Sequence, residues 1–297
     1  MIEVSNLTQT YRSGKGVFNL DFKITEGEVF GYLGPNGAGK TTTIRNLLGF
    51  ANADQGRAKI NGLDCRKEAI KLQGNIGYLP GETAFLDHMS GIEFLNFMGE
   101  MRGTKDLSIR NGLIDRLDLD TKGKIKKMSK GMKQKLAIVT AFMHDPSVYI
   151  LDEPTSGLDP FMQNTFMDLL DDEKGRGKTI MMSSHIFEEV QRSCDRAGII
   201  REGRIVAIED VQFLNSMKQK TYTVTMSDAN DTEILVKSGL EVEKISDSRV
   251  QITVGYNYKE LFEILAKCSV VGLYSQQQSL EDVFMKYYGK EEEHSDD

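Results

Sequence analysis

The sequence has 297 residues, of which 39% are hydrophobic and 27% are charged, and its formal net charge is −7. A chain of this length can form one large domain and a smaller one, each with a buried core. A chain with this net negative charge lacks the broad positive potential that non-specific nucleic-acid binding requires, so we expect no nucleic-acid partner. No stretch approaches the roughly 18 consecutive apolar residues of a membrane-spanning helix, and no leader segment is expected.

The three cysteines, Cys65, Cys194 and Cys268, are widely spaced. An odd number of scattered cysteines fits neither a disulfide framework nor a metal-binding motif. We therefore expect free thiols, as in a cytosolic protein.

A glycine-rich loop is the most informative motif. The apolar run over residues 29–33 predicts a buried strand, the segment from Gly34 to Thr41 fits the pattern G-x-x-x-x-G-K-[ST], and helical spacing follows up to Gly49. Glycines allow consecutive backbone N–H groups to turn toward an anion, and the next helix points its positive end at it. The residues expected to bind a nucleotide here are Gly34, Pro35, Asn36, Gly37, Ala38, Gly39, Lys40, Thr41 and Thr42.

Two side chains of this loop have specific predicted roles. Lys40 is expected to reach the β- and γ-phosphates, and the Thr41 hydroxyl is expected to bind Mg²⁺. Upstream, Tyr11 lies in a polar segment. Its flat ring could stack on an adenine, with ordinary surface packing as the alternative.

The sequence around the loop predicts further strands. Alternation over residues 17–25 predicts a half-buried strand, and Asn61-Gly62 predicts a hairpin turn. We expect a small antiparallel sheet beside the nucleotide-binding core.

Two amphipathic helices are expected after residue 84. Ser90 and Glu93 form a capping box at the start of a helix that reaches Arg102. The expected apolar face of this helix comprises Ile92, Phe94, Leu95, Phe97, Met98 and Met101. The stripe of the second helix comprises Ile109, Leu113 and Leu117. Core packing is the simpler interpretation of both stripes, and a docking arm is the alternative.

Polar side chains follow two more predicted strands. Residues 147–151 lead to Asp152 and Glu153, and residues 179–184 lead to His185. Ligands bind at the carboxyl ends of parallel strands, so we expect these side chains near the glycine-rich loop. Asp152 is expected to hold Mg²⁺, Glu153 to polarise a water, and His185 to contact the γ-phosphate.

In chain order, these motifs resemble the nucleotide-binding subunits of ABC transporters over residues 1–215. The matching elements are Tyr11 for the adenine-stacking aromatic, 34–42 for the Walker A loop, 128–132 (Met-Ser-Lys-Gly-Met) for the signature motif, 148–153 for the Walker B strand with its catalytic glutamate, 156–159 for the D-loop and His185 for the switch histidine.

The resemblance implies a catalytic site that is complete only in a dimer. In this family, ATP lies between the Walker A loop of one subunit and the signature helix of the other. Ser129, Lys130 and Gly131 would therefore contact the nucleotide of the partner, and Asp159 would act across the interface. The implied catalytic residues are Lys40, Glu153 and His185, the implied metal ligands are Thr41 and Asp152, and the implied ligands are ATP and Mg²⁺.

Two departures from the family pattern stand out. The family usually has a Mg²⁺-binding glutamine at the position of Gly81, which is followed here by Glu82. Metal binding by this loop is therefore in question. The signature motif has Met128 in place of leucine and Lys130 in place of glycine, and an added cation facing phosphate should not weaken binding.

The expected fold is α/β, with a P-loop NTPase core of the ABC ATPase type, an antiparallel β subdomain and a helical subdomain, followed by a small α+β domain. The expected boundaries are 1–215 for the nucleotide-binding domain, about 84–145 for its helical subdomain, 216–290 for the C-terminal α+β extension and 291–297 for a disordered acidic tail. Alternation at 222–226 and 250–254, a helical stripe at 261–268 and a helix starting at Ser279 support the extension. It resembles that of bacterial drug- and antibiotic-export cassettes.

The resemblance implies an ATP-binding and ATP-hydrolysing subunit that drives a separate integral membrane permease, for export. It would lie in the cytoplasm, on the inner face of the membrane, and pair with a second nucleotide-binding subunit as a homodimer or heterodimer. One alternative is a soluble ABC-type ATPase of translation or DNA maintenance, although these usually have two cassettes or a long coiled coil. Another is a nucleotide-sensing module with impaired hydrolysis, against which Glu153 and His185 argue.

Overall fold

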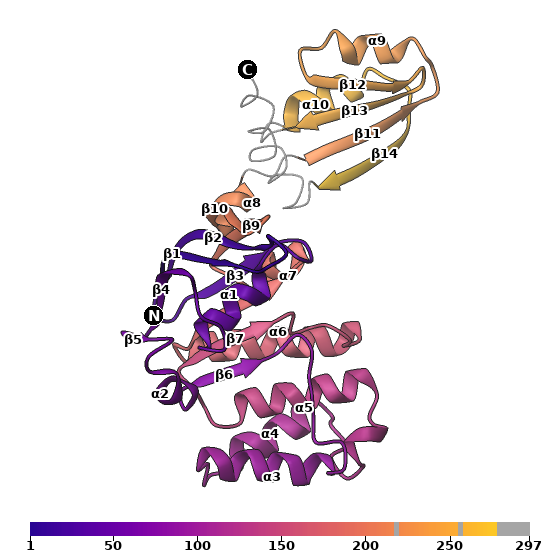
Figure 1. The fold of residues 1–297 in the computed structure, drawn as a ribbon. Coiled ribbons are helices and arrows are strands. Elements are labelled where there is room, and N and C mark those ends of the chain that lie inside the picture. Colours follow the sequence, from indigo (N-terminus) through magenta and orange to yellow (C-terminus); the bar gives the residue numbers. More distant parts are fainter. Residues whose placement is uncertain (217–219, 255–257, 278–297) are drawn as a thin grey trace. The chain divides into compact units, whose positions relative to one another are not determined.

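The computed structural model describes residues 1–216, 220–254 and 258–277. The chain divides into two compact units, Met1–Val211 and Gln212–Asp297, which are described separately (Figure 1). The sequence predicted a division between 215 and 216. The predicted helix from Ser279 and the predicted tail 291–297 lie outside the described residues.

The first unit contains a six-stranded, mostly parallel sheet. Its strand order is β10-β9-β3-β8-β7-β6. The strands are β3 (Val29–Leu33), β6 (Ile76–Leu79), β7 (Val148–Asp152), β8 (Thr179–Ser184), β9 (Arg196–Arg201) and β10 (Arg204–Asp210). β3 pairs in parallel with β8 and β9, and β7 with β6 and β8, whereas β10 is antiparallel. The carboxyl ends of β3, β7 and β8 therefore lie at one edge of the sheet.

A second, antiparallel sheet has the order β2-β1-β4-β5. Its strands are β1 (Ile2–Thr10), β2 (Gly16–Ile24), β4 (Gln55–Ile60) and β5 (Leu63–Asp64). The alternation on β2 is confirmed, because Leu20, Phe22 and Ile24 are buried. The predicted hairpin is also confirmed: Asn61 and Gly62 both have positive φ and join β4 to β5.

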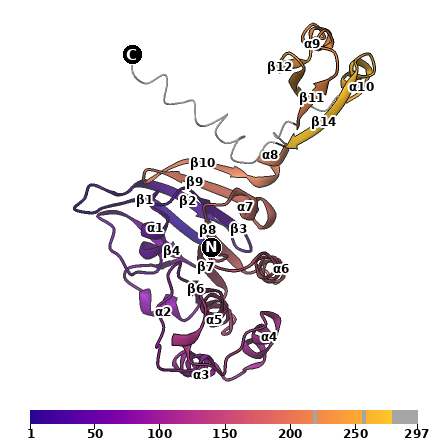
Figure 2. The ribbon, with the colours of Figure 1, turned by 90° about the vertical axis from the view of Figure 1, so that its right-hand side faces the viewer.

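Helices cover the six-stranded sheet and extend beyond it. They are α1 (Lys40–Leu47), α2 (Ala69–Gln73), α3 (Gly91–Arg102), α4 (Ser108–Arg116), the 3₁₀ helix η1 (Ile125–Lys127), α5 (Lys130–Phe142), α6 (Pro160–Gly175) and α7 (Phe187–Ser193). Helix α8 (Val211–Ser216) begins at the boundary between the two units. In Figures 1 and 2, α3 and α4 lie beside α5, beyond β6. Contacts of α5 with β6, α3 and α4 join this helical segment to the sheet.

The predicted apolar face of α3 is partly wrong. The capping box of Ser90 and Glu93 is present, but Phe97 is 38% and Met101 69% exposed, and Phe94 and Leu95 are buried. Six apolar residues in this helix spread over more than one face, since each residue turns by about 100°. Only the face directed toward α5 is buried.

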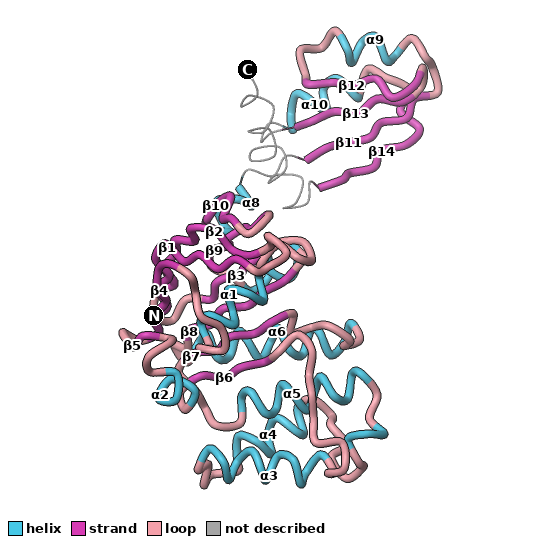
Figure 3. Tube along the Cα trace, viewed as in Figure 1, coloured by secondary structure: helices cyan, strands magenta, loops and turns pink. Residues whose placement is uncertain are grey.

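The described residues of the second unit form a four-stranded antiparallel sheet of order β12-β13-β11-β14, accompanied by helices α9 and α10. Its elements are β11 (Lys220–Met226), α9 (Asp231–Val236), β12 (Glu241–Ser246), β13 (Arg249–Val254), α10 (Tyr258–Leu265) and β14 (Val270–Gln277). Figure 3 shows the βαββαβ sequence of a ferredoxin-like fold. The predicted alternation is confirmed, because Val224, Ile252 and Leu261 are fully buried in one core. The α+β class of this unit is therefore confirmed.

Candidate active site

The glycine-rich loop connects β3 to α1. Gly37 and Gly39 have φ values of 83° and 111°, which favour glycine. A Cβ at Gly34 would lie 2.3 Å from the carbonyl oxygen of Ile200, and one at Gly39 would lie 2.7 Å from Val17 Cγ1. Glycine is therefore required here for both backbone conformation and close packing.

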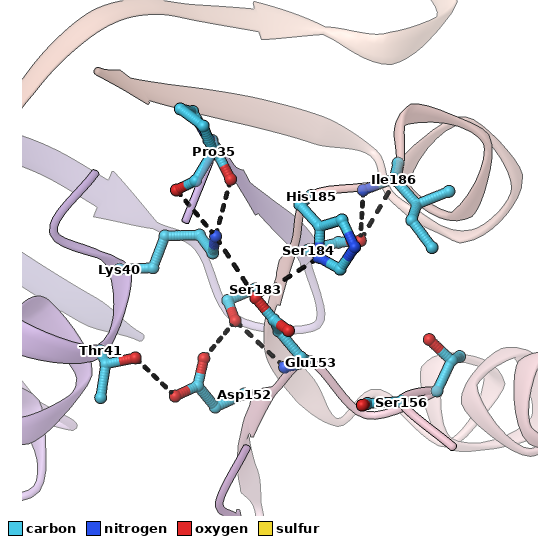
Figure 4. Close-up of polar contacts among 12 residues, drawn as sticks. Pro35, Lys40, Thr41, Asp152, Glu153, Ser156, Ser183, Ser184, His185 and Ile186 are labelled. Carbon is cyan, nitrogen blue, oxygen red and sulfur yellow. Dashed lines mark hydrogen bonds and ion pairs between the residues drawn. The ribbon is translucent and has the colours of Figure 1, made fainter. Parts of the chain in front are cut away.

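Lys40 is the buried cation of this loop. Its Nζ donates hydrogen bonds to the carbonyl oxygens of Gly34 at 2.6 Å and Pro35 at 3.2 Å. It also lies 3.4 Å from Glu153 Oε1. Figure 4 shows the Lys40 side chain directed across the loop toward Glu153. The ammonium group is thereby held at the carboxyl ends of β3 and β7.

Asp152 lies at the end of β7, between two hydroxyl groups. Its Oδ2 accepts a hydrogen bond from Thr41 Oγ1 at 3.0 Å, and its Oδ1 accepts one from Ser183 Oγ at 2.5 Å. A carboxylate and a hydroxyl are oxygen ligands of the kind that Mg²⁺ prefers, with water and phosphate oxygens completing the shell. Thr41 and Asp152 therefore fit a Mg²⁺ that arrives with a nucleotide. No cluster of three or more His, Cys, Asp or Glu side chains suited to a metal occurs among the described residues.

Glu153 lies next to Asp152 and is held through its backbone. Its φ is 48°, in the left-handed region that glutamate rarely adopts. Its N–H donates to the carbonyl oxygen of Ser183 at 3.2 Å and to Ser183 Oγ at 3.1 Å. Its Oε1 lies 3.4 Å from His185 Nδ1, in addition to the Lys40 contact. The three predicted catalytic side chains therefore converge on one carboxylate oxygen.

A pocket of about 310 Å³ lies beside the loop. The predicted residues that border it are Tyr11, Asn36, Gly37, Gly39, Lys40, Thr41, Thr42 and Glu153. Tyr11 is 40% exposed, so its ring is accessible for stacking. The structure thus brings Tyr11 to the same pocket as the loop, although they are separated in the sequence.

The predicted signature and D-loop residues lie around the starts of α5 and α6, outside the Tyr11 pocket. Ser129 Oγ accepts the N–H of Met132 and caps α5, and Asp159 Oδ1 accepts the N–H of Met162 and caps α6. Lys130 Nζ lies 3.3 Å from Ser156 Oγ. Ser129, Lys130, Gly131 and Asp159 are absent from the described lining of the Tyr11 pocket.

The position of Gly81 lies directly beside Asp152. A Cβ at Gly81 would lie 3.5 Å from Asp152 Oδ2, in ordinary contact. A second cavity, of about 540 Å³, is bordered by Gly81, Glu82, Thr41 and Asp152. Tyr78 also borders it, and burial, together with the Asp152 charge, raises its pKa to about 12.

Sequence reasoning missed the residues that hold the catalytic side chains. Ser183 contacts both Asp152 and the Glu153 backbone. The buried Gln134 donates a hydrogen bond from Nε2 to the Pro154 carbonyl oxygen at 2.7 Å. The signal available in the sequence was a polar residue within an apolar segment. Ser183 and Ser184 end the apolar strand β8, and Gln134 lies within helix α5.

Comparisons with known proteins agree with this geometry. Residues 17–156 match the ABC transporter family model. The chain is 30% identical to the linearmycin resistance ATP-binding protein LnrL of Bacillus subtilis (strain 168), covering 98% of this chain and 99% of that protein. It is 34% identical to the bacitracin transport ATP-binding protein BcrA of Bacillus licheniformis, covering 97% of each chain. A solved ATP-binding subunit of an ABC transporter has a TM-score of 0.67 and 28% identity, covering 72% of this chain and 92% of that one.

The chain belongs to the ATP-binding proteins of ABC transporters. It is an ATPase subunit whose hydrolysis is coupled to transport. The predicted family and P-loop NTPase fold are confirmed. Among the described helices, none combines the length and apolar character needed to cross a membrane.

Proposed function

We propose that this ATPase energises a separate integral membrane permease for export, from the cytoplasmic face of the membrane, with Mg²⁺-bound ATP as its substrate. The observation that carries the proposal is the contact of one Glu153 oxygen with both Lys40 and His185, next to the Thr41–Asp152 pair. Similarity over nearly the whole chain to the bacitracin transport and linearmycin resistance proteins supports export of an antibiotic-like compound.

Each side chain has a separate role in this proposal. Lys40 binds the β- and γ-phosphates, and Tyr11 stacks on the adenine. Glu153 orients the attacking water and accepts its proton, while His185 contacts the γ-phosphate. The Mg²⁺, held by Thr41 and Asp152, would neutralise charge on the phosphates.

The remaining predicted residues belong to the site of a second cassette, in a homodimer or heterodimer. Ser129 and Gly131 lie at the start of α5, where backbone N–H groups and the helix dipole favour an anion. Lys130 adds a cation there, and Asp159 lies at the start of α6. Ser129, Gly131 and Asp159 are absent from the described linings of both cavities beside Thr41, which supports action on the nucleotide of the partner, whereas Lys130 also borders the Gly81 cavity of its own chain.

The test separates binding from hydrolysis. Glu153→Gln keeps the size of the side chain but removes the charge that activates water, so hydrolysis should fall by about 10²–10⁴-fold while ATP binding is retained. The variant should accumulate as an ATP-stabilised dimer, because ATP bound at the interface favours association. Sedimentation velocity with and without ATP measures this.

Two further variants control the experiment. Ser129→Arg in the Glu153→Gln background should prevent the dimer, and Asp152→Asn should weaken Mg²⁺-dependent ATP binding. A Glu153→Gln chain that hydrolyses ATP at the parental rate would refute the role of Glu153. A dimer unaffected by Ser129→Arg would refute the shared site.

A further inference from the structure

A buried carboxylate outside the predicted catalytic set borders the same cavity as Glu153 and His185. Glu189, on α7, is 9% exposed. Its Oε2 accepts a hydrogen bond from Ser184 Oγ at 2.7 Å, and its Oε1 accepts one from Thr155 Oγ1. Thr155 and Ser184 are themselves 4% and 2% exposed. The three side chains therefore form a buried polar group with both carboxylate oxygens hydrogen-bonded.

The two hydroxyl groups belong to the two loops that carry the reacting side chains. Thr155 lies two positions after Glu153, and Ser184 immediately precedes His185. Ser184 Oγ also accepts the backbone N–H of Ile186 at 2.9 Å, which fixes the turn around His185 (Figure 4). A small cavity of about 220 Å³ is bordered by Glu153, His185 and Glu189. One carboxylate thus connects the loop of Glu153 to the loop of His185.

The hydrogen bonds of Glu189 determine how Thr155 and Ser184 are oriented. Thr155 Oγ1 and Ser184 Oγ both donate to the Glu189 carboxylate, and Ser184 Oγ also lies 3.3 Å from the Ile186 carbonyl oxygen. Burying a carboxylate is costly unless such bonds compensate, so the contacts are retained together or lost together. The described ion pairs include none to Glu189, so these hydroxyls are its specific partners among the contacts found.

We propose that Glu189 is a positioning residue that holds the Glu153 and His185 loops in register for hydrolysis. It acts through Thr155 and Ser184, and its described hydrogen bonds include none to the phosphate loop. The inference rests on the roles proposed above for Glu153 and His185. Hydrolysis therefore depends on Glu189, whereas ATP binding at Lys40 does not.

The experiment compares Glu189→Ala with Glu189→Gln in the full chain. Glu189→Ala should lower kcat by about 10–100-fold, because small misplacements of reacting groups have effects of this size, with the ATP dissociation constant changed by less than about twofold. Glu189→Gln should restore kcat to within about threefold of the parent, since its amide can serve both hydroxyls. Glu188→Ala is the matched control, because Glu188 is an exposed glutamate on the same helix.

A double-mutant cycle tests whether Glu189 acts on hydrolysis through Thr155. Thr155→Val should lower kcat alone but add little in the Glu189→Ala background. A Glu189→Ala chain with parental kcat overturns the proposal, as does an equal loss of kcat and ATP affinity. If Glu189→Ala does not fold, parental kcat in both Thr155→Val and Ser184→Ala overturns it. Failure of the proposed function is distinguished by Glu153→Gln, whose parental activity would refute that role whatever Glu189 does.

Discussion

At the scale of single residues, the ammonium group of Lys40 organises the phosphate loop. It is 5% exposed and reaches two loop carbonyl oxygens and the Glu153 carboxylate. In this position it is the loop cation placed to exchange those contacts for phosphate oxygens. Charge-assisted hydrogen bonds of this kind are stronger than neutral ones.

We expect Lys40→Ala to weaken ATP binding on the order of 10²-fold, because about two charge-assisted hydrogen bonds to phosphate are lost. Titration with a fluorescent ATP analogue measures the affinity, and a phosphate-release assay measures turnover. Lys67→Ala, which removes an exposed lysine outside the Tyr11 pocket, is the control. Parental affinity in Lys40→Ala would show that the nucleotide binds elsewhere.

At the scale of elements, the loop after β6 leaves space beside Asp152. Gly81 does not have positive φ, and a Cβ there makes only ordinary contacts, so a side chain is accommodated. Gly81→Gln should fold normally and add an oxygen ligand near Asp152. We expect the Mg²⁺ concentration at half-maximal nucleotide binding to fall by about 2–10-fold, which corresponds to one added polar contact.

The companion variant is Glu82→Ala, which removes the carboxylate bordering the same cavity. If Glu82 supplies the oxygen that glutamine supplies elsewhere in the family, the midpoint should rise. An unchanged midpoint in Glu82→Ala would exclude Glu82 from the metal shell. An unchanged midpoint in Gly81→Gln would show that this loop stays away from the metal.

The junction between α5 and β7 contains a half-buried histidine. His144 Nε2 lies 2.6 Å from Arg102 Nη1 and 3.2 Å from the Ile76 carbonyl oxygen. Because an arginine always donates, Nε2 accepts, and the proton lies on Nδ1, which is buried without a partner among the described residues. Burial and then the Arg102 charge lower the pKa of His144 from 6.5 to about 4.

This pKa difference predicts a pH dependence of stability. Below about pH 6.5 the unfolded chain binds a proton that the folded chain does not, so stability is full above this pH and is lost as the pH falls toward 4. The loss from this group should be about 2 kcal/mol between pH 7 and 4.5. Urea unfolding across this range should show a shallower dependence for His144→Asn than for the parent. The exposed His88→Asn is the control, and parallel curves for parent and His144→Asn would contradict the assignment.

The sequence predicted elements and the phosphate loop better than it predicted contacts. Periodicity located β2 and a capping box located the start of α3, because these signals are local. The exposure of Phe97 was not predictable, since it depends on which face of α3 meets α5. Glu189 resembled an ordinary acidic residue near a helix start, and its burial depends on strands β7 and β8 being neighbours. Strand order is a long-range property that no local pattern specifies.

At the scale of the whole molecule, the two units have separate hydrophobic cores. The core of the first is centred on the sheets around β1 and β3, and the core of the second includes Val224, Ile252 and Leu261. Domains with their own cores generally unfold as separate cooperative units. We therefore expect two transitions in differential scanning calorimetry.

ATP should raise the transition temperature of the first unit only. At an ATP concentration 100 times the dissociation constant, its free energy of unfolding should increase by about 2.7 kcal/mol. Ile252→Ala should lower only the other transition, since truncating a fully buried isoleucine costs about 2–5 kcal/mol. A single transition that responds to both ATP and Ile252→Ala would contradict the independence of the units.

The left-handed backbone of Glu153 has a consequence for how the protein could evolve. At a φ of 48°, asparagine or glycine would relieve the conformational cost, on the order of 1 kcal/mol. Backbone conformation alone therefore favours replacing the glutamate, whereas hydrolysis and the contacts with Lys40 and His185 favour keeping it. If ATP turnover ceased to matter to the organism, mutation would remove this side chain early. A glutamate retained at this backbone angle therefore indicates selection for ATP hydrolysis at the expense of conformational stability.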